Sequence, residues 1–153
     1  TLPPNMTHQG NLIGCYLNSA KWIAMFFKKR KDTNTNLGTE AELWAQTFLE
    51  QQGLKTITKN FHGTRGEIDL IMRHNRTLVF VEVRLRSTNR HGNAMDSIDK
   101  RKQQRIISAA QNYLQIEGLW DQAQCRFDAI CLDKDPDNSA QYQVEWLRNA
   151  FSA

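Results

Sequence analysis

The sequence predicts one small α/β domain in which two helices flank a mixed β-sheet. Three observations support this fold class. An amphipathic helical pattern opens the domain, strand-like segments with a tight turn follow, and a second long helical pattern precedes another strand. A chain of 153 residues, of which 40% are hydrophobic, is long enough to bury one such core.

The domain is predicted to occupy residues 37–153, after a leader of residues 1–36 that ends in a polar, linker-like stretch. The apolar segment Leu12–Phe27 is shorter than the roughly 20 residues that a membrane span needs. Its basic residues follow the apolar stretch, unlike those of a secretory signal. We therefore expect a cytoplasmic protein with no membrane partner. Residues 1–24 are interpreted as an upstream extension, and an amphipathic helix that contacts a membrane is the alternative.

The first helix is predicted over Thr39–Gln52. Apolar residues recur at the spacing of one buried helical face, namely Ala41, Trp44, Ala45, Phe48 and Leu49. Thr39 and Glu42 have the spacing of an N-terminal capping box, and Gly53 suits the position after the last turn.

Three strands are predicted next, over Leu54–Asn60, Glu67–Arg73 and Thr77–Arg86. The loop Gly63–Gly66 separates the first two. In the third strand, residues 78–81 are apolar at successive positions, which is typical of a strand buried on both faces. This strand should therefore lie in the centre of the sheet.

A second helix is predicted over Ser97–Glu117, capped by Asp96 or Ser97 and ended by Gly118. A strand over Arg126–Leu132 and a short segment over Tyr142–Leu147 complete the order α-β-β-β-α-β. The three cysteines, Cys15, Cys125 and Cys131, are odd in number and form no CxxC pair. They are interpreted as buried free thiols rather than as a disulfide framework or a zinc site.

Two acidic residues are predicted to face each other in the central hairpin. If Asn75 and Arg76 form a two-residue turn, Asp69 lies directly opposite Glu82 on the same face of the sheet. Their Cβ atoms would then be about 5 Å apart. The alternation of a strand places Arg84 on that face beside Glu82.

This pair of carboxylates needs compensation, because opposed like charges and buried carboxylates both destabilise a sheet. A hard divalent cation such as Mg²⁺, or Mn²⁺, would stabilise both groups through oxygen ligands. The alternative is a structural ion cluster in which Arg84 and Arg73 neutralise the pair.

Positive charge is concentrated near the same stretch. Residues 1–105 hold 17 Lys and Arg against 9 Asp and Glu, whereas residues 106–153 hold 3 against 7. Such polarity is compatible with a polyanionic partner, although a run of charge on a helix is often only its solvated face. The candidate phosphate-binding residues are Arg84, Arg86, Arg90, Lys100, Arg101, Lys102 and Arg105.

Several blocks of this sequence resemble the YraN family of bacterial proteins. The blocks are Gly66–Ile71, Phe80–Arg84, the helix with Lys102, and Arg126–Asp128, in this order. That family is similar to Holliday-junction resolvases with the restriction-endonuclease-like PD-(D/E)XK fold. The resemblance covers about residues 37–151 and implies a nuclease-like core, nucleic-acid binding with DNA as the expected partner, and a homodimer.

The resemblance also implies roles for individual residues. Asp69 matches the metal-binding aspartate and Glu82 the first residue of the (D/E)XK element, with the carbonyl of Val83 as a further metal ligand. Arg84 stands where that element has Lys. Arg is always protonated, so it can stabilise a phosphate but cannot accept a proton, and Lys102 is a candidate for the missing ammonium.

Glu42 matches a glutamate that the superfamily often has on its first helix, although the capping box explains it equally well. Other residues are predicted to be structural or solvated. Glu67 is expected to be solvated at the start of its strand, and Asp128 to form an ion pair. Trp44, Trp120 and Trp146 are expected to pack in the core or at its rim.

Together these features predict a Mg²⁺-dependent endonuclease-like protein. The alternative is a non-catalytic nucleic-acid-binding or assembly protein that retains the fold of a nuclease.

Overall fold

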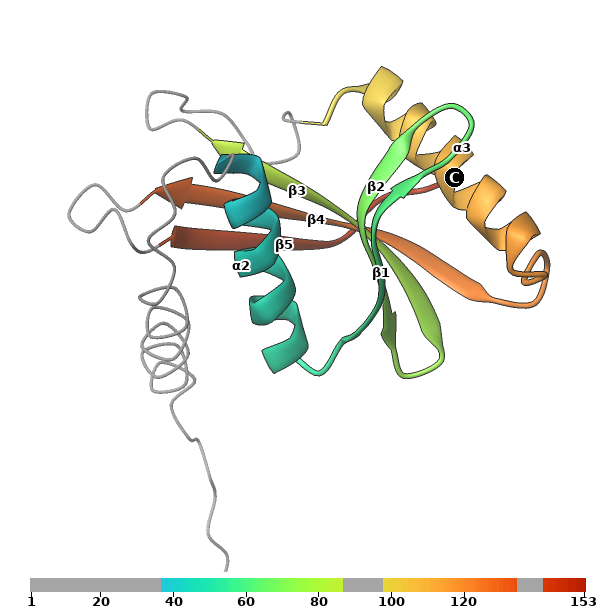
Figure 1. Cartoon of the computed structure of the whole chain (residues 1–153), viewed down its shortest axis with the longest axis horizontal. Helices are drawn as coiled ribbons and strands as arrows, with labels where there is room; N and C mark the ends of the chain where they lie inside the picture. The colour runs from blue at the N-terminus through green and yellow to red at the C-terminus, as the bar shows by residue number, and fades with distance from the viewer. Residues whose placement is uncertain (1–36, 87–97, 135–141) are drawn as a thin grey trace, which may run out of the picture.

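The computed structural model describes residues 37–86, 98–134 and 142–153 (Figure 1). The predicted leader, Cys15 and Arg90 lie outside these residues. Two helices and five strands follow in the order α2 (Leu37–Gln51), β1 (Lys55–His62), β2 (Glu67–His74), β3 (Thr77–Arg86), α3 (Lys100–Ile116), β4 (Gln124–Lys134) and β5 (Tyr142–Phe151). The predicted α/β class and order of elements are confirmed, and the segment after β4 is a full fifth strand.

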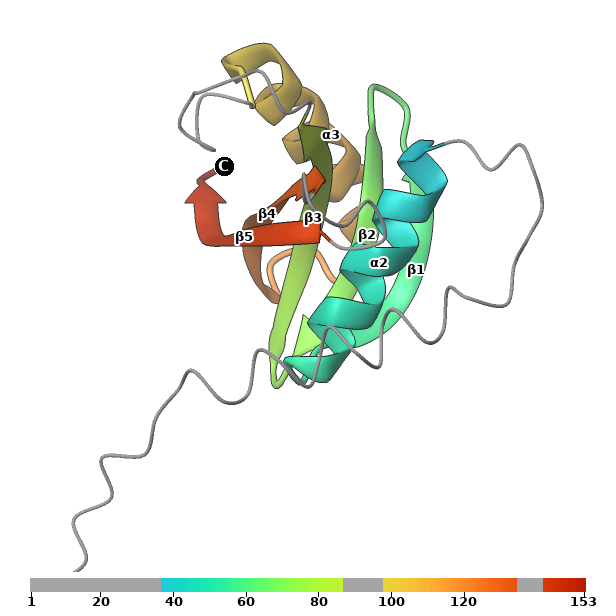
Figure 2. The ribbon, with the colours of Figure 1, turned by 90° about the vertical axis from the view of Figure 1, so that its left-hand side faces the viewer.

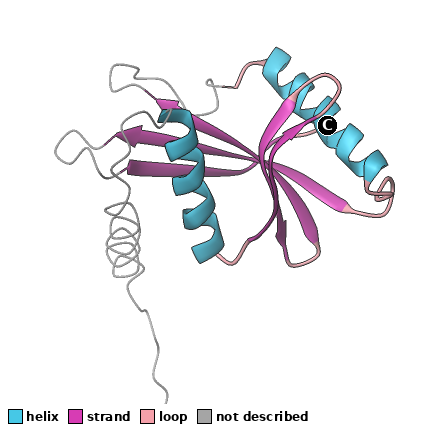
Figure 3. Cartoon of the chain, in the orientation of Figure 1, coloured by secondary structure: helices cyan, strands magenta, loops and turns pink. Residues whose placement is uncertain are grey.

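The five strands form one mixed sheet in the order β1-β2-β3-β4-β5. Neighbouring strands are antiparallel except for β3 and β4, which are parallel and are joined through α3. Strand β3 is central as predicted, and Leu78, Val79, Phe80 and Val81 are all buried. This mixed sheet with two helices is consistent with a nuclease-like core (Figure 3).

The helices cover opposite faces of the sheet (Figure 1 and Figure 2). Helix α2 packs through Trp44, Phe48 and Leu49 on one apolar cluster with Val79 and Val81. Helix α3 packs on a second cluster that includes Phe80 and Phe127, through the residues Ile106, Ala109, Ala110 and Tyr113. Alternate residues of β3 therefore serve two separate cores.

Both helix starts differ from the prediction. Helix α2 begins at Leu37, so Thr39 lies inside the helix and is not the N-terminal cap. Helix α3 begins at Lys100, and its cap is Asp99, whose carboxylate accepts a hydrogen bond of 2.7 Å from the backbone N–H of Lys102. The capping motifs were misplaced because Thr, Ser and Asp residues stand at several neighbouring positions of the sequence.

The predicted hairpin turn is confirmed. His74 pairs with Thr77, and Asn75 adopts the positive φ of 57° that a two-residue turn requires. From this turn the ladder between β2 and β3 extends only to the pair Leu70–Val81, whereas β3 stays paired with β4 as far as Arg86. Strands β2 and β3 therefore separate beyond Val81, and Figure 1 shows the two strands diverging from each other.

The prediction for the cysteines is partly wrong. Cys131 is a buried free thiol, but Cys125 is exposed because it lies near the start of β4, at the rim of the sheet. Within the described ranges, no helix is long and apolar enough to cross a membrane.

Candidate metal and nucleic-acid site

Asp69 and Glu82 meet where β2 and β3 separate. The register of the hairpin places them at the same level, one residue beyond the last pair, Leu70–Val81. There the carboxylate of Asp69 takes the place of a backbone acceptor, because its Oδ2 accepts a hydrogen bond of 2.7 Å from the backbone N–H of Val83. At this end of the ladder, a side chain therefore accepts the hydrogen bond from the neighbouring strand.

The alternation of β2 is broken at this level. Leu70 and Met72 belong to the core under α2, whereas both Ile68 and Ile71 belong to the core under α3. A regular strand would place Ile68 with Leu70. The irregularity lies at Asp69, which explains why its side chain reaches the backbone of β3 instead of standing on one face of the sheet.

Glu82 is held by two cations on one of its oxygens. Its side chain is only 3% exposed, and Oε1 lies 3.1 Å from Nζ of Lys102 and 3.7 Å from a terminal nitrogen of Arg84. The other oxygen, Oε2, is buried and receives no hydrogen bond. Arg73, proposed as a second neutralising group, pairs with Leu78 near the opposite end of the hairpin.

The pKa values of both carboxyl groups are raised above their ordinary values. Burial, followed by the negative charge of Asp69, raises the pKa of Glu82 to about 7, against the opposing effects of Lys102 and Arg84. Burial also raises the pKa of Asp69, against the hydrogen bond from Val83. When one group is protonated it can donate a hydrogen bond to the other, as paired carboxyl groups do.

Glu42 approaches this pair from α2. Burial, and next the charge of Asp69, raises the pKa of the Glu42 carboxyl, while a hydrogen bond from the side chain of Asn60 lowers it. Because the helix begins before Thr39, the capping box no longer explains Glu42. Glu67 lies 3.7 Å from His62 with its side chain half exposed, in agreement with its predicted solvation.

Two glycines fix α3 against the sheet and so place Lys102. A Cβ atom at Gly66 would overlap the backbone carbonyl of Arg105, and one at Gly63 would lie 2.9 Å from Cα of Ala109. The loop between β1 and β2 therefore packs directly on the backbone of α3. This close packing explains why both positions are occupied by glycine. Arg105 is one turn after Lys102.

The predicted phosphate-binding residues divide into two groups. Lys100, Arg101 and Arg105 are exposed on α3, close to Lys102. Arg86, by contrast, is mostly buried and lies 2.9 Å from Asp133 and 3.0 Å from Glu145. These contacts join the ends of β3, β4 and β5, and they explain Arg86 as a structural residue.

The donor set fits a hard divalent cation, with two carboxylates and one backbone carbonyl. In a strand the N–H and C=O of one residue point to the same side. Because the N–H of Val83 points to Asp69, its carbonyl also faces the gap between β2 and β3. Across the described residues no group of three or more His, Cys, Asp or Glu side chains is placed to hold a metal ion. The observation that supports a metal ion here is Oε2 of Glu82, which is buried and has no hydrogen-bond partner.

Asp128 forms the ion pair expected of it. Its fully buried carboxylate accepts hydrogen bonds from Nε of Arg126, Nε1 of Trp146 and the backbone N–H of Asn149, at 2.9–3.2 Å. These partners use both oxygens and leave no open position. Trp44 and Trp146 pack against Phe48 as expected, and Trp120 lies 44% exposed at the rim.

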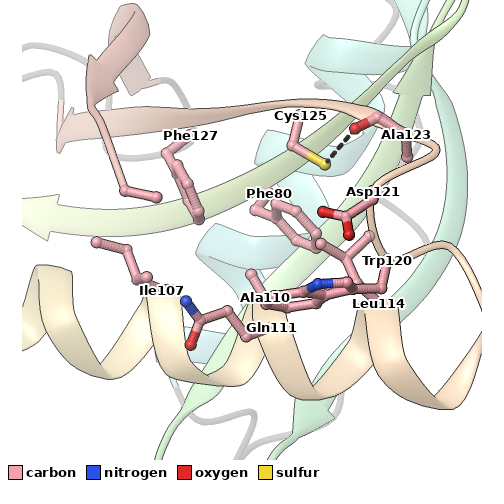
Figure 4. A pocket seen from close by; sticks show the side chains of 11 residues that line it. Phe80, Ile107, Ala110, Gln111, Leu114, Trp120, Asp121, Ala123, Cys125 and Phe127 are labelled. Carbon is pink, nitrogen blue, oxygen red and sulfur yellow. Dashed lines mark hydrogen bonds between the residues drawn. The ribbon is translucent and has the colours of Figure 1, made fainter.

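A separate apolar pocket lies under the C-terminal half of α3 (Figure 4). Phe80, Phe127, Leu114 and Trp120 form much of its wall, and the thiol of Cys125 donates a hydrogen bond of 3.5 Å to the carbonyl of Ala123. The pocket includes none of the predicted site residues, and Asp121 is the one acidic side chain among its lining residues. It therefore lacks the paired acids found between β2 and β3.

Comparison with known proteins identifies one family. A family model described as "Uncharacterised protein family UPF0102" matches residues 41–132. A UPF0102 protein of Pseudomonas syringae pv. syringae (strain B728a) is 42% identical over 124 residues, which cover 81% of this chain and 99% of the relative. A UPF0102 protein of Nitrosomonas europaea is 47% identical over 116 residues, which cover 76% and 93%. A third, from Pseudomonas fluorescens (strain Pf0-1), is 46% identical over 116 residues, which cover 76% and 92%.

Proposed function

The chain belongs to the UPF0102 family, and we propose that it is a divalent-metal-dependent nuclease that hydrolyses phosphodiester bonds in nucleic acid, with branched DNA as the expected substrate. The YraN resemblance noted from the sequence agrees with this family, whereas the activity is our inference from the site.

One observation carries the proposal, namely the buried Oε2 of Glu82 next to Asp69. An oxygen that lies in the protein interior without a hydrogen bond costs free energy, and a second carboxylate at its side adds to that cost. Burial and the charge of Asp69 raise the pKa of Glu82 to about 7, so the pair can carry a proton near neutral pH. A divalent cation can replace that proton and satisfy both groups.

Asp69, Glu82 and the carbonyl of Val83 would hold the metal ion. When bound, such an ion supplies a Lewis acid that lowers the pKa of water and withdraws charge from a phosphate. Glu42 reaches the same region from α2 and would accept hydrogen bonds from a water molecule there.

Two cations next to Glu82 would act on the phosphate. Arg84 is 40% exposed, so its guanidinium can contact both Glu82 and a substrate oxygen. It can stabilise charge that grows on the phosphate but cannot remove a proton from water. Lys102 supplies the ammonium that strand β3 lacks, because α3 brings its Nζ to Glu82.

The exposed basic residues of α3 would bind the sugar–phosphate backbone. Lys100 and Arg101 precede Lys102 in the first turn, and Arg105 follows one turn later. Contacts of this kind position a nucleic acid without reading its sequence. We therefore expect affinity that depends strongly on salt and little on sequence.

A titration of Mg²⁺ or Mn²⁺ with a labelled four-way DNA junction, and with linear duplex as comparison, tests this function. Wild type should cleave only with metal, and Asp69→Asn should remove cleavage. Glu117→Gln, which removes an exposed carboxylate at the end of α3, should cleave like wild type. Loss of activity in Glu117→Gln, or equal activity in Asp69→Asn, would contradict the proposal.

A second candidate, a non-catalytic nucleic-acid-binding or assembly protein, has its own supporting observation. Lys102 and Arg84 already compensate Glu82 without a metal ion, as in the structural cluster considered from the sequence. This candidate predicts salt-sensitive DNA binding without cleavage, and the binding should be unchanged in Asp69→Asn. Absence of any salt-sensitive affinity for DNA would exclude both and favour a protein–protein adaptor.

A further inference from the structure

We propose that Arg65, in the loop between β1 and β2, and Arg105 of α3 bind one sugar–phosphate backbone from two sides, next to the candidate metal site. The proposal rests on the proposed function for the identity of the partner, a nucleic acid. The charge contacts themselves can be tested by binding alone, without cleavage.

The loop between β1 and β2 lies directly against α3 (Figure 1). A Cβ atom on Gly66 would lie 3.1 Å from Cβ of Arg105. At the start of the loop, the backbone N–H of Thr64 donates a hydrogen bond of 3.3 Å to the side-chain oxygen of Asn112. Arg65 stands between these two contacts, so the fold fixes its backbone beside the helix.

The side of α3 that faces the loop is basic. Arg101 and Arg105 are four residues apart, so they are neighbours on the helix surface. Asn112 follows Arg105 by seven residues and continues the same side, and its contact with Thr64 shows that this side faces the loop. Arg65, Arg101 and Arg105 are all exposed, and we call them the loop–helix surface.

No carboxylate compensates the loop–helix surface. Within the described ranges, none of its three arginines lies at ion-pair distance from an acidic side chain. Glu67, two residues after Arg65, lies 3.7 Å from His62 instead. The first turn of α3 also contains no acidic residue. Positive charges that packing brings together repel one another, and a bound polyanion would remove that repulsion.

The loop–helix surface leads to the carboxylate pair along both elements. From Gly66 the chain reaches Asp69 in three residues, about 10 Å in a strand. On α3, Arg105 follows Lys102 by about 4.5 Å along the helix axis, and Lys102 contacts Glu82. One strand of a nucleic acid advances about 3.4 Å per nucleotide. The surface should therefore bind phosphates about one to three nucleotides from the bond at the metal site.

Four variants separate charge from structure. Arg65→Gln removes the charge, whereas Arg65→Lys retains it. Arg105→Gln, alone and combined with Arg65→Gln, completes a double-mutant cycle. Arg76→Gln is the matched control, because Arg76 is also an exposed arginine in a tight connection but lies in the turn between β2 and β3.

Fluorescence anisotropy with a four-way junction that cannot branch-migrate, in metal-free buffer, measures binding without cleavage. Arg65→Gln should lower the slope of log affinity against log salt by about 0.9 and weaken binding roughly eightfold at about 0.1 M salt. Arg105→Gln should act similarly, and the double variant should lower the slope by about 1.8. Arg65→Lys and Arg76→Gln should keep the wild-type slope.

A wild-type slope in Arg65→Gln would overturn the proposal. Thermal unfolding without DNA provides the structural control, because an exposed arginine with no partner should leave the melting temperature unchanged. If Arg65→Gln melted at a clearly lower temperature, and Arg65→Lys failed to restore binding, Arg65 would be a structural residue of the loop and the proposal would also be wrong.

A scan with single methylphosphonate linkages locates the contacts, because each such linkage removes one phosphate charge. The linkage bound by Arg65 should weaken binding of wild type but have no effect on Arg65→Gln. The linkage found in the same way for Arg105 should be the adjoining one. If the two linkages were far apart on the strand, or on different strands, the two arginines would not bind one backbone together.

Failure of the proposed function gives a different result. If wild type binds the junction with a slope that depends on Arg65 but never cleaves it with Mg²⁺ or Mn²⁺, the nuclease is refuted and the phosphate contacts stand. If wild type cleaves and Arg65→Gln binds and cleaves equally well, the function stands and this inference is wrong.

Discussion

Nζ of Lys102 lies 3.1 Å from Oε1 of Glu82, so the nearest ammonium to the carboxylate pair comes from helix α3 and not from strand β3. The same oxygen is 3.7 Å from Arg84, two residues along the strand. The shorter contact belongs to a compact ammonium on a flexible side chain, and the longer one to a planar guanidinium.

Lys102→Gln should lower junction cleavage by roughly a hundredfold, because it removes a charged group directed at the reacting centre. It should also move the acid limb of the pH–rate profile to higher pH. Lys102 favours the ionised form of Glu82, so without it the pKa of Glu82 rises further. Lys100→Gln, an exposed change on the same helix, serves as the control and should affect substrate affinity only.

Metal binding should depend on pH around neutrality. Burial and the charge of Asp69 raise the pKa of Glu82 to about 7, so below this pH the carboxyl carries a proton that a metal ion must displace. The apparent affinity for Mn²⁺ should therefore rise about tenfold per pH unit up to roughly pH 7 and then level off. Calorimetry in two buffers of different ionisation enthalpy measures the released proton. An affinity that is constant from pH 5.5 to pH 7 would contradict the proton–metal exchange.

Without metal, Glu82→Gln should stabilise the fold at high pH. The folded-state pKa of Glu82, about 7, is above its ordinary value of 4.5, so its contribution to stability is full below 4.5 and is lost as pH rises to about 7. Because Gln cannot ionise, Glu82→Gln avoids this loss. Its free energy of unfolding should exceed that of wild type by up to about 3 kcal/mol at pH 8. Chemical denaturation at pH 5 and pH 8 should show a gain in the variant that grows with pH. If the variant and wild type differed in stability by the same amount at pH 5 and at pH 8, the pKa of Glu82 would not be raised in the folded protein.

The sequence predicted the part of this site that depends on local rules. The Asn75–Arg76 turn fixed the register of the hairpin, and the register placed Asp69 level with Glu82. It did not predict the broken alternation at Asp69, which lies level with Asn60 of β1, a strand residue with a φ of +50°. The sequence signal for this irregularity was an isolated Asn in a strand-like segment. Polar residues are common in such segments, so this signal did not stand out.

Contacts that depend on packing were harder to predict. Lys102 was named from the sequence, but its contact with Glu82 depends on how closely the loop Gly63–Gly66 approaches α3. In the same way, Arg86 was indistinguishable from the other basic residues until β4 and β5 supplied Asp133 and Glu145. The sequence gives the number and positions of the charged residues, whereas the partners of each charged side chain depend on the fold.

Gly66→Ala tests the role of that close approach. The added Cβ would overlap the backbone carbonyl of Arg105, which is part of a helix and cannot move alone. We expect a loss of about 1–3 kcal/mol in stability, as for other overpacked sites, and weaker junction cleavage because α3 carries Lys102 away from Glu82. Gly53→Ala is the control, since Gly53 has a φ of +88° but no atom near its would-be Cβ, so only backbone strain of about 1 kcal/mol follows. Denaturation and junction-cleavage assays of both variants separate backbone strain from displacement of α3.

The two groups of basic residues should respond to salt in different ways. Arg101 and Arg105 are exposed on α3, and each phosphate contact that is lost should reduce the slope of log affinity against log salt by about 0.9. Arg101→Gln and Arg105→Gln together should therefore lower that slope by roughly 2, for branched and linear DNA alike. Arg86→Gln should instead leave the slope unchanged and lower stability, because it leaves Asp133 and Glu145 without their shared partner. If Arg86→Gln reduced the slope as much as the helix variants do, the DNA would have to bind across the ends of β3, β4 and β5, and the assignment of α3 as the binding surface would be wrong.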